Sequence, residues 1–172
     1  DGSLRLLDPG SCVSNFVLLL VMVRLGLGIS KDVYLVELLP KNSKAQSVQI
    51  ITLVACWDGH LSEQEIGSLL RKIELMAGLT NGEWDPSMHR QLTNAFCETL
   101  EFAPQLSGRE MKEFIKKAAS RITDESLRKA TLNLAFQVAS ADSLDEDEAR
   151  LLFEFGQEYW DMSPDDIREA VE

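Results

Sequence analysis

Apolar residues recur at helical spacing over most of the chain from residue 45 onward. No stretch of alternating polar and apolar residues flanked by hairpin turns competes with this pattern, so we predict an all-α chain. The predicted inward positions are Val48, Ile51, Thr52 and Ala55; Leu92, Ala95, Phe96, Thr99 and Leu100; Met111, Phe114, Ile115 and Ala118; Leu127, Ala130, Thr131, Leu134, Ala135 and Val138; and Leu151, Leu152, Phe155 and Tyr159.

Polar residues predict where these helices begin and end. A Ser or Asp followed three residues later by Glu forms a capping box, in which each residue satisfies a backbone N–H group of the other. An Asp or Ser before Pro also favours a helix start, and Gly favours an end. The predicted starts are Ser62, Asp85, Ser107, Thr123 to Glu125, Asp145 and Ser163, and Gly78 ends the helix that begins near Ser62.

Residues 1–44 form an N-terminal helical segment of uncertain role. Residues 13–29 are the most apolar run, but Asn15, Arg24 and two glycines interrupt it. It falls short of the roughly 20 clean residues that a membrane span needs, and no basic region precedes it as in a signal peptide. We therefore expect a core helix, with a signal-like or membrane-contacting segment as the alternative. Residues 45–172 form the main helical domain, in one compact unit with the N-terminal helices.

The second part of the helical domain repeats the first. At an offset of 84, Ile50 meets Leu134, Val54 meets Val138 and Asp58 meets Asp142. After the bend the offset is 83, so that Leu61 meets Leu144, Ser62 meets Asp145 and Glu65 meets Glu148. A match that extends over both flanking helices predicts two pseudo-repeated helix-turn-helix halves.

Charge is distributed unevenly along the 172-residue chain, whose formal net charge is −11. Residues 141–172 carry twelve Asp/Glu against two arginines, whereas residues 1–44 carry four Asp/Glu against five Lys/Arg. An acidic surface repels phosphate backbones, so we expect cations or basic proteins as partners and no nucleic acid. Cys12, Cys56 and Cys97 fit no metal-ligand spacing, which favours buried thiols in a reducing cytoplasm.

Asp58, Gly59 and Glu65 form an acidic bend between two predicted helices. They match the second half of an EF-hand loop, in which a glutamate closes the loop six positions after the glycine. Val54 and Cys56 stand where that loop needs oxygen ligands, so the bend is not an EF-hand. Carboxylates at a sharp turn can still hold a hard cation such as Ca²⁺.

Residues 56–65 (CWDGHLSEQE) and 140–148 (SADSLDEDE) both follow the pattern Ala-Asp-Gly-x-hydrophobic-Ser/Asp-x-x-Glu, with departures. On these two turns, residues 45–172 resemble the TerB-like (tellurite resistance B) family of helical proteins. The resemblance implies two pseudo-symmetric halves, acidic clusters that bind a divalent metal such as calcium, a role in tellurite and other stress responses, and partner proteins at the membrane. The metal ligands that it implies are Asp58, Glu65, Asp142, Asp145 and Glu148.

Two departures from the family pattern bear on these sites. Trp57 replaces the usual small residue in the first turn, and the second turn is one residue shorter and lacks the glycine. The first turn is therefore the better candidate for a metal site.

A metal-free interpretation accounts for part of the same motif. Ser62 with Glu65, and Asp145 with Glu148, occupy capping-box positions. Acids in the first turn of a helix are stabilised by the helix dipole by about 0.3–1 kcal/mol each without any metal. By this interpretation the motif only fixes a tight connection between helices.

Asp58 and Asp142 precede the bends and have no evident capping role, so they favour the cation site. No nucleophile with an adjacent base, glycine-rich phosphate loop or cofactor fingerprint accompanies them, and we do not expect an enzyme. We therefore expect a cytoplasmic TerB-like module that binds a divalent cation. The alternative is a metal-free helical interaction or co-chaperone-like scaffold domain that presents its acidic C-terminal face to a basic partner. Either module allows a homo-oligomer.

Overall fold

The computed structural model describes residues 39–57, 61–79, 83–141, 144 and 146–171, with the backbone alone at residues 147 and 148. These residues belong to one compact unit that spans residues 38–172. They form helices and turns without a strand, which confirms the all-α prediction. None of the described helices is long and apolar enough to cross a membrane. The predictions for the N-terminal segment, including the apolar run, lie outside the described residues.

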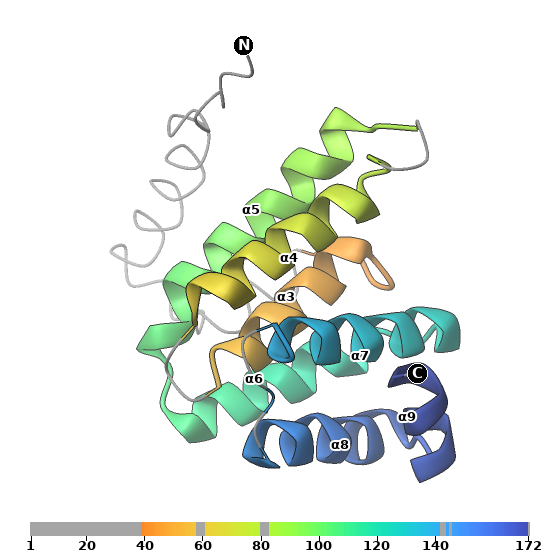
Figure 1. Cartoon of the computed structure of the whole chain (residues 1–172). Helices are drawn as coiled ribbons and strands as arrows, with labels where there is room; N and C mark the ends of the chain where they lie inside the picture. The colour runs from red at the N-terminus through yellow and green to blue at the C-terminus, as the bar shows by residue number, and fades with distance from the viewer. Residues whose placement is uncertain (1–38, 58–60, 80–82, 142–143, 145, 172) are drawn as a thin grey trace. The chain divides into compact units, whose positions relative to one another are not determined.

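Seven α-helices and one short 3₁₀ helix make up the described part of the chain (Figure 1). In order they are α3 (Lys44–Ala55), α4 (Glu63–Met76), α5 (Pro86–Phe102), the 3₁₀ helix η1 (Ala103–Gln105), α6 (Gly108–Ser120), α7 (Glu125–Ala139), α8 (Glu146–Trp160) and α9 (Pro164–Val171).

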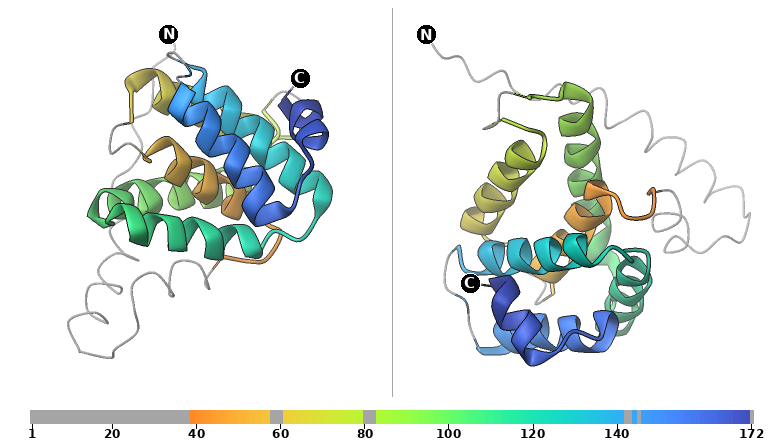
Figure 2. Two further views of the ribbon diagram at one scale, coloured as in Figure 1. Left: turned by 90° about the horizontal axis from the view of Figure 1, so that it is seen from below. Right: turned by 90° about the vertical axis from the view of Figure 1, so that its right-hand side faces the viewer.

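Helix α3 lies at the centre of the unit, with α4, α5, α6 and α7 packed around it (Figures 1 and 2). Every residue from Ala45 to Ala55 is buried. The four predicted inward positions, Val48, Ile51, Thr52 and Ala55, are buried as predicted, and the residues between them are buried as well. A helix that is covered on all sides has no solvent face, although its sequence still contains buried polar residues such as Gln46 and Thr52.

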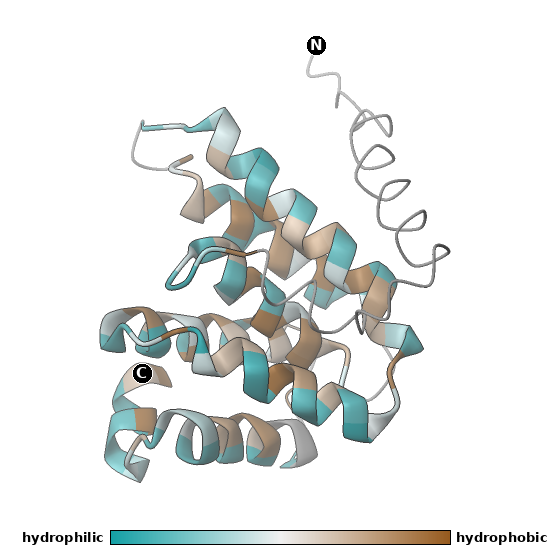
Figure 3. Cartoon of the chain, turned by 180° about the vertical axis from the view of Figure 1, so that it is seen from behind, coloured by the Kyte–Doolittle hydropathy of each residue, from teal (hydrophilic) through white to brown (hydrophobic). Residues whose placement is uncertain are grey.

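Helices α8 and α9 complete the unit by packing on α6 and α7. Trp160, at the end of α8, is 4% exposed, and its indole N–H donates a hydrogen bond to the carbonyl oxygen of Ala119 at 3.0 Å. Phe155 packs edge-on against the same indole, with ring centroids 4.7 Å apart. Hydrophilic and hydrophobic positions mix along these outer helices (Figure 3), as expected for helices with one buried and one solvated face.

The predicted helix starts are confirmed wherever the structure describes them. Ser62 and Ser107 open α4 and α6 with complete capping boxes, while Asp85 and Asp124 cap α5 and α7 through their side chains. The start predicted at Asp145 lies outside the described residues. These starts were predictable because each depends on residues no more than three positions apart.

The inward stripe predicted for α7 is partly wrong. Ala130 is exposed and Leu134 is half-buried, whereas Leu132 is fully buried. The reason is that α3, α4, α8 and α9 all contact α7, so its buried surface is wider than one stripe and is rotated relative to the predicted one.

Helices α3 and α7 end in the same way, at equivalent positions of the predicted repeat. Cys56 donates its backbone N–H to the carbonyl oxygen of Thr52 at 3.0 Å, and Ser140 donates in the same way to Phe136 at 2.9 Å. The helices that follow, α4 and α8, also begin at equivalent residues. Helices α4 and α5 pack on α3, as α8 and α9 pack on α7. The internal repeat itself stays a prediction, which these parallels support.

A hydrogen bond also joins two residues at equivalent positions of the predicted repeat. Ser47 on α3 and Thr131 on α7 are both buried, and their hydroxyl oxygens lie 2.8 Å apart. A contact between equivalent residues is expected where a pseudo-two-fold axis passes between two helices.

Candidate acidic-turn site

The first acidic turn is held between the end of α3 and the start of α4. The backbone N–H of Ser62 donates to Oε2 of Glu65 at 2.8 Å, and the N–H of Glu65 donates to Oγ of Ser62 at 3.2 Å. Glu65 therefore fills its capping-box position as predicted. Asp58, its predicted partner in a metal site, lies outside the described residues.

Glu65 differs from the other capping carboxylates in its burial. It is 4% exposed, whereas Glu110 in the capping box of α6 is exposed and Asp166 at the start of α9 is half-buried. The N–H groups of Ser62 and Ser107 both donate to such a carboxylate at 2.8 Å. A cap therefore does not require the acid to be buried. Burying a carboxylate costs free energy, so the burial of Glu65 needs an explanation that its capping role does not supply.

The two helix ends at this turn carry opposite dipole charges, since α4 begins here with its positive end. The C-terminal end of α3 carries the negative end of the helix dipole, and its last turn contains no basic residue. One basic group approaches from another helix, since Nζ of Lys112 on α6 lies 5.5 Å from the ring centroid of Trp57. This lysine places a positive charge over the residue that precedes Asp58.

The second acidic turn follows α7, which ends at Ala139. Asp142 and Asp145 lie outside the described residues, and of Glu148 the structure describes only its place in α8. Of the five predicted metal ligands, Glu65 is thus the one whose side chain can be placed. Within the described ranges, no three His, Cys, Asp or Glu residues come together in a group that could hold a metal ion.

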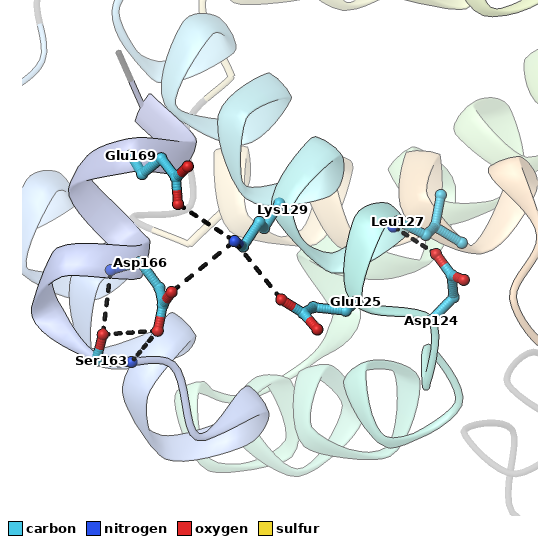
Figure 4. A network of polar contacts seen from close by, with 7 residues as sticks. All are labelled: Asp124, Glu125, Leu127, Lys129, Ser163, Asp166 and Glu169. Atoms are coloured by element: carbon cyan, nitrogen blue, oxygen red, sulfur yellow. Dashed lines mark hydrogen bonds and ion pairs between the residues drawn. The ribbon is translucent and has the colours of Figure 1, made fainter.

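A polar cluster that the sequence analysis missed joins α7 to α9 (Figure 4). Nζ of Lys129 lies 3.3 Å from a carboxylate oxygen of Glu169, 3.6 Å from one of Glu125 and 3.8 Å from one of Asp166. The hydrogen bond from Lys129 to Glu169 and the charge of Glu169 are the main causes that raise the pKa of Lys129. The partners on α9 are far from Lys129 in sequence, so no local pattern could have identified this cluster.

Asp166 also closes the start of α9. The hydroxyl of Ser163 donates to Oδ2 of Asp166 at 2.6 Å, and the backbone N–H of Ser163 donates to the same oxygen at 3.1 Å. These two hydrogen bonds, with a further contribution from Lys129, lower the pKa of Asp166. The cluster therefore links α9 to α7 through ion pairs and hydrogen bonds whose carboxylates are exposed to solvent.

A groove of about 440 Å³ lies beside this cluster. Its lining includes Lys129 and Glu169, together with Asn133, whose amide donates to the carbonyl oxygen of Ala170 at 2.5 Å. Lys129 is already surrounded by three carboxylates. Its positive charge is therefore compensated and would not select an anionic ligand.

Burial raises the pKa of two further titratable groups. Burial, followed by the charge of Glu101, raises the pKa of Glu98 on α5. Burial also raises the pKa of Tyr159 on α8, with smaller contributions from nearby glutamates that include Glu158 and Glu113. In both cases, burial and the negative charge of neighbouring glutamates disfavour the ionised form of the side chain.

Comparisons of the chain with models of protein families, with curated proteins and with solved structures find no match. The resemblance to the TerB-like family therefore rests on the two acidic turns in the sequence and is used below only as a hypothesis.

Proposed function

We propose that the chain is a TerB-like helical module that binds a divalent cation, with Ca²⁺ as the first candidate, at the acidic turn between α3 and α4. The observation that carries this proposal is the burial of Glu65, which is 4% exposed at the start of a helix where an exposed carboxylate would cap equally well. The carboxylate oxygens of Glu65 and Asp58 are of the kind that a hard cation such as Ca²⁺ prefers as ligands.

The position of the turn supports the same function. Hard cations bind carboxylate and backbone carbonyl oxygens, and the C-terminal end of a helix such as α3 presents carbonyl oxygens together with a negative dipole. The cellular role that accompanies this proposal is a cytoplasmic stress response of the tellurite-resistance type. That role follows from the resemblance of the two acidic turns alone.

Thermal melting of the intact chain tests the proposal, in EDTA and in millimolar Ca²⁺ or Mg²⁺. At a cation concentration of about 100 times Kd, binding to the folded state adds about 2.7 kcal/mol. For a chain of this size, such a gain raises the Tm by roughly 5–10 °C. An unchanged Tm in both cations would rule the site out.

Matched substitutions localise the effect. Glu65→Gln keeps the capping geometry and removes the charge, so it should abolish the cation-dependent shift, and Asp58→Asn should do the same. Glu110→Gln makes the same change in the exposed capping box of α6 and should leave the shift intact. Asp142→Asn should have a smaller effect, because the second turn lacks the glycine. A shift that persists in Glu65→Gln and Asp58→Asn would indicate unspecific surface binding.

A second function, a metal-free helical interaction module, is favoured by a different observation. The capping box of α6 has the same hydrogen bonds as that of α4 without any acidic turn before it. Glu65 can thus be explained as a cap, and the acidic C-terminal residues would then attract a basic protein partner. A Tm that responds to neither cation would support this function over the first.

A further inference from the structure

Helix α7 is covered less completely than α3. The 17-residue helix α5 packs on α3, and every residue of α3 from Ala45 to Ala55 is buried. The helix that follows α8 and packs on α7 is α9, which has eight residues. On α7, Ala130 is exposed and Leu134 is half-buried. Part of the apolar surface of α7 therefore remains in contact with solvent.

The groove of about 440 Å³ beside the Lys129 cluster lies at this uncovered part of α7. Ala130 and Leu134 are four residues apart and therefore lie on one face of α7. Ala170 adds an apolar side chain from α9. The complete lining is Lys129, Ala130, Asn133, Leu134, Glu169 and Ala170.

Polar contacts hold the last turn of α9 against α7 and so fix the shape of the groove. The amide of Asn133 donates to the carbonyl oxygen of Ala170 at 2.5 Å. Gln137 donates to the side-chain oxygen of Asn133, and Lys72 on α4 donates to that of Gln137. A groove that is formed in advance binds a partner without the cost of ordering these side chains.

The charge beside the groove is negative (Figure 4). Lys129 is the one cation among the carboxylates of Glu125, Asp166 and Glu169, so the cluster has an excess of negative charge. The side chain of Glu169 is 74% exposed and is accessible to a partner. Residues 141–172 as a whole carry twelve Asp/Glu against two arginines. A ligand that complements this groove therefore combines an apolar face with positive charge.

A helix is the element that meets both requirements. An amphipathic helix places its apolar face in a groove through side chains three or four positions apart, and its other face carries the charges. Within this chain, α5 covers α3 by the same kind of packing. We propose that the groove between α7 and α9 binds a basic amphipathic helix of a partner protein, with its apolar face on Ala130 and Leu134.

This inference rests on the second function given above, the helical interaction module, and specifies its binding site and the chemistry of its partner. The lysines or arginines of the bound helix meet the carboxylates of Glu169 and Asp166 at the edge of the groove. Binding at this groove requires no cation.

A labelled peptide of about 18 leucines and lysines, with the leucines on one helical face, is the probe. Fluorescence anisotropy measures its binding to the intact chain in EDTA. We expect saturable binding with a Kd on the order of 10–100 μM, because the groove is smaller than a standard protein interface. A peptide with the same composition in scrambled order has no apolar face and should bind at least tenfold more weakly.

Two pairs of variants locate the binding. Ala130→Trp fills the groove with a bulky side chain and should weaken binding at least tenfold, whereas Gln157→Trp adds the same side chain at an exposed position of α8 and should leave binding unchanged. Glu169→Gln should weaken binding about twofold to fivefold, as expected for an exposed ion pair. Glu158→Gln removes an exposed carboxylate from α8 and should change it less. Circular dichroism verifies that each variant is folded.

Three results would overturn the proposal. Equal binding of the scrambled peptide would show that charge alone attracts the probe. Binding that Ala130→Trp leaves unchanged would place the partner elsewhere and retain only the general interaction function. Absence of saturable binding would overturn the groove and that function together. Because the measurement is made in EDTA, none of these results depends on the cation site.

Discussion

Alanine at Gly78 should destabilise the protein, whereas alanine at Gly67, inside α4, should stabilise it. Gly78 follows the end of α4 with φ of 91°, and a Cβ atom there would lie 2.5 Å from the carbonyl oxygen of Glu83 and 2.9 Å from its carbonyl carbon. A Cβ atom at Gly67 meets nothing within 4 Å. The same substitution thus tests two opposite environments, one inside a helix and one just past its end.

The structure sets the size of both effects. A non-glycine residue in the left-handed region costs about 1–2 kcal/mol. The clash with Glu83 also displaces the segment whose Asp85 N–H bonds to Ala77, which costs a further ~0.5–1.5 kcal/mol. We therefore expect Gly78→Ala to lower the free energy of unfolding by about 1.5–3.5 kcal/mol. Gly67→Ala should raise it by about 0.5–1 kcal/mol, the difference in helix propensity.

Urea unfolding followed by circular dichroism measures both changes, provided that the m value is the same in all variants. Gly78→Asn separates the two causes, because asparagine tolerates the left-handed region better than alanine and still carries a Cβ atom. It should recover only the part of the loss that comes from φ. A Gly78→Ala variant within about 0.5 kcal/mol of the parent chain would refute the close approach of Glu83.

Two further predictions concern contacts between distant parts of the chain. Thr131→Val should lower the free energy of unfolding by about 1–3 kcal/mol, because it leaves the buried hydroxyl of Ser47 without this partner. In a double-mutant cycle with Ser47→Ala, the two costs should not add. Additive costs would mean that the two hydroxyls do not interact. The lowered pKa of Asp166 contributes stability that is present above its ordinary value of 3.8 and is lost as pH falls through the lowered pKa. Ser163→Ala should raise this pKa in an NMR titration of the carboxyl group, and an unchanged pKa would contradict the assigned cause.

The features that sequence analysis predicted correctly are those that depend on neighbouring residues. The capping box of Ser107 and Glu110 needs two side chains three positions apart, and the turn at Gly78 needs only one residue that accepts a positive φ. The helical class follows from spacing within one or two turns. Each of these features is determined by a short stretch of sequence and does not depend on which other helices pack against it.

The features that it missed depend on distant neighbours. Lys129 pairs with Asp166 and Glu169 only because α9 folds back onto α7. The exposure of Ala130 and the full burial of Leu132 are likewise fixed by which helices contact α7, because both are small or apolar residues that suit either position. Periodicity locates an apolar face without specifying how wide it is.

The acidic turn combines both kinds of information, which is why the motif alone leaves its function open. Glu65 and Glu110 make the same backbone hydrogen bonds. The local sequence therefore explains both caps but does not distinguish the two residues from each other. What separates them is burial, since Glu65 is enclosed by the packing of α4 in the unit while Glu110 stays in solvent. The cation proposal therefore concerns the buried carboxylate of Glu65, which the exposed Glu110 does not share. Because glutamine preserves the cap at both positions, a cation response lost in Glu65→Gln and kept in Glu110→Gln would assign the response to that buried charge.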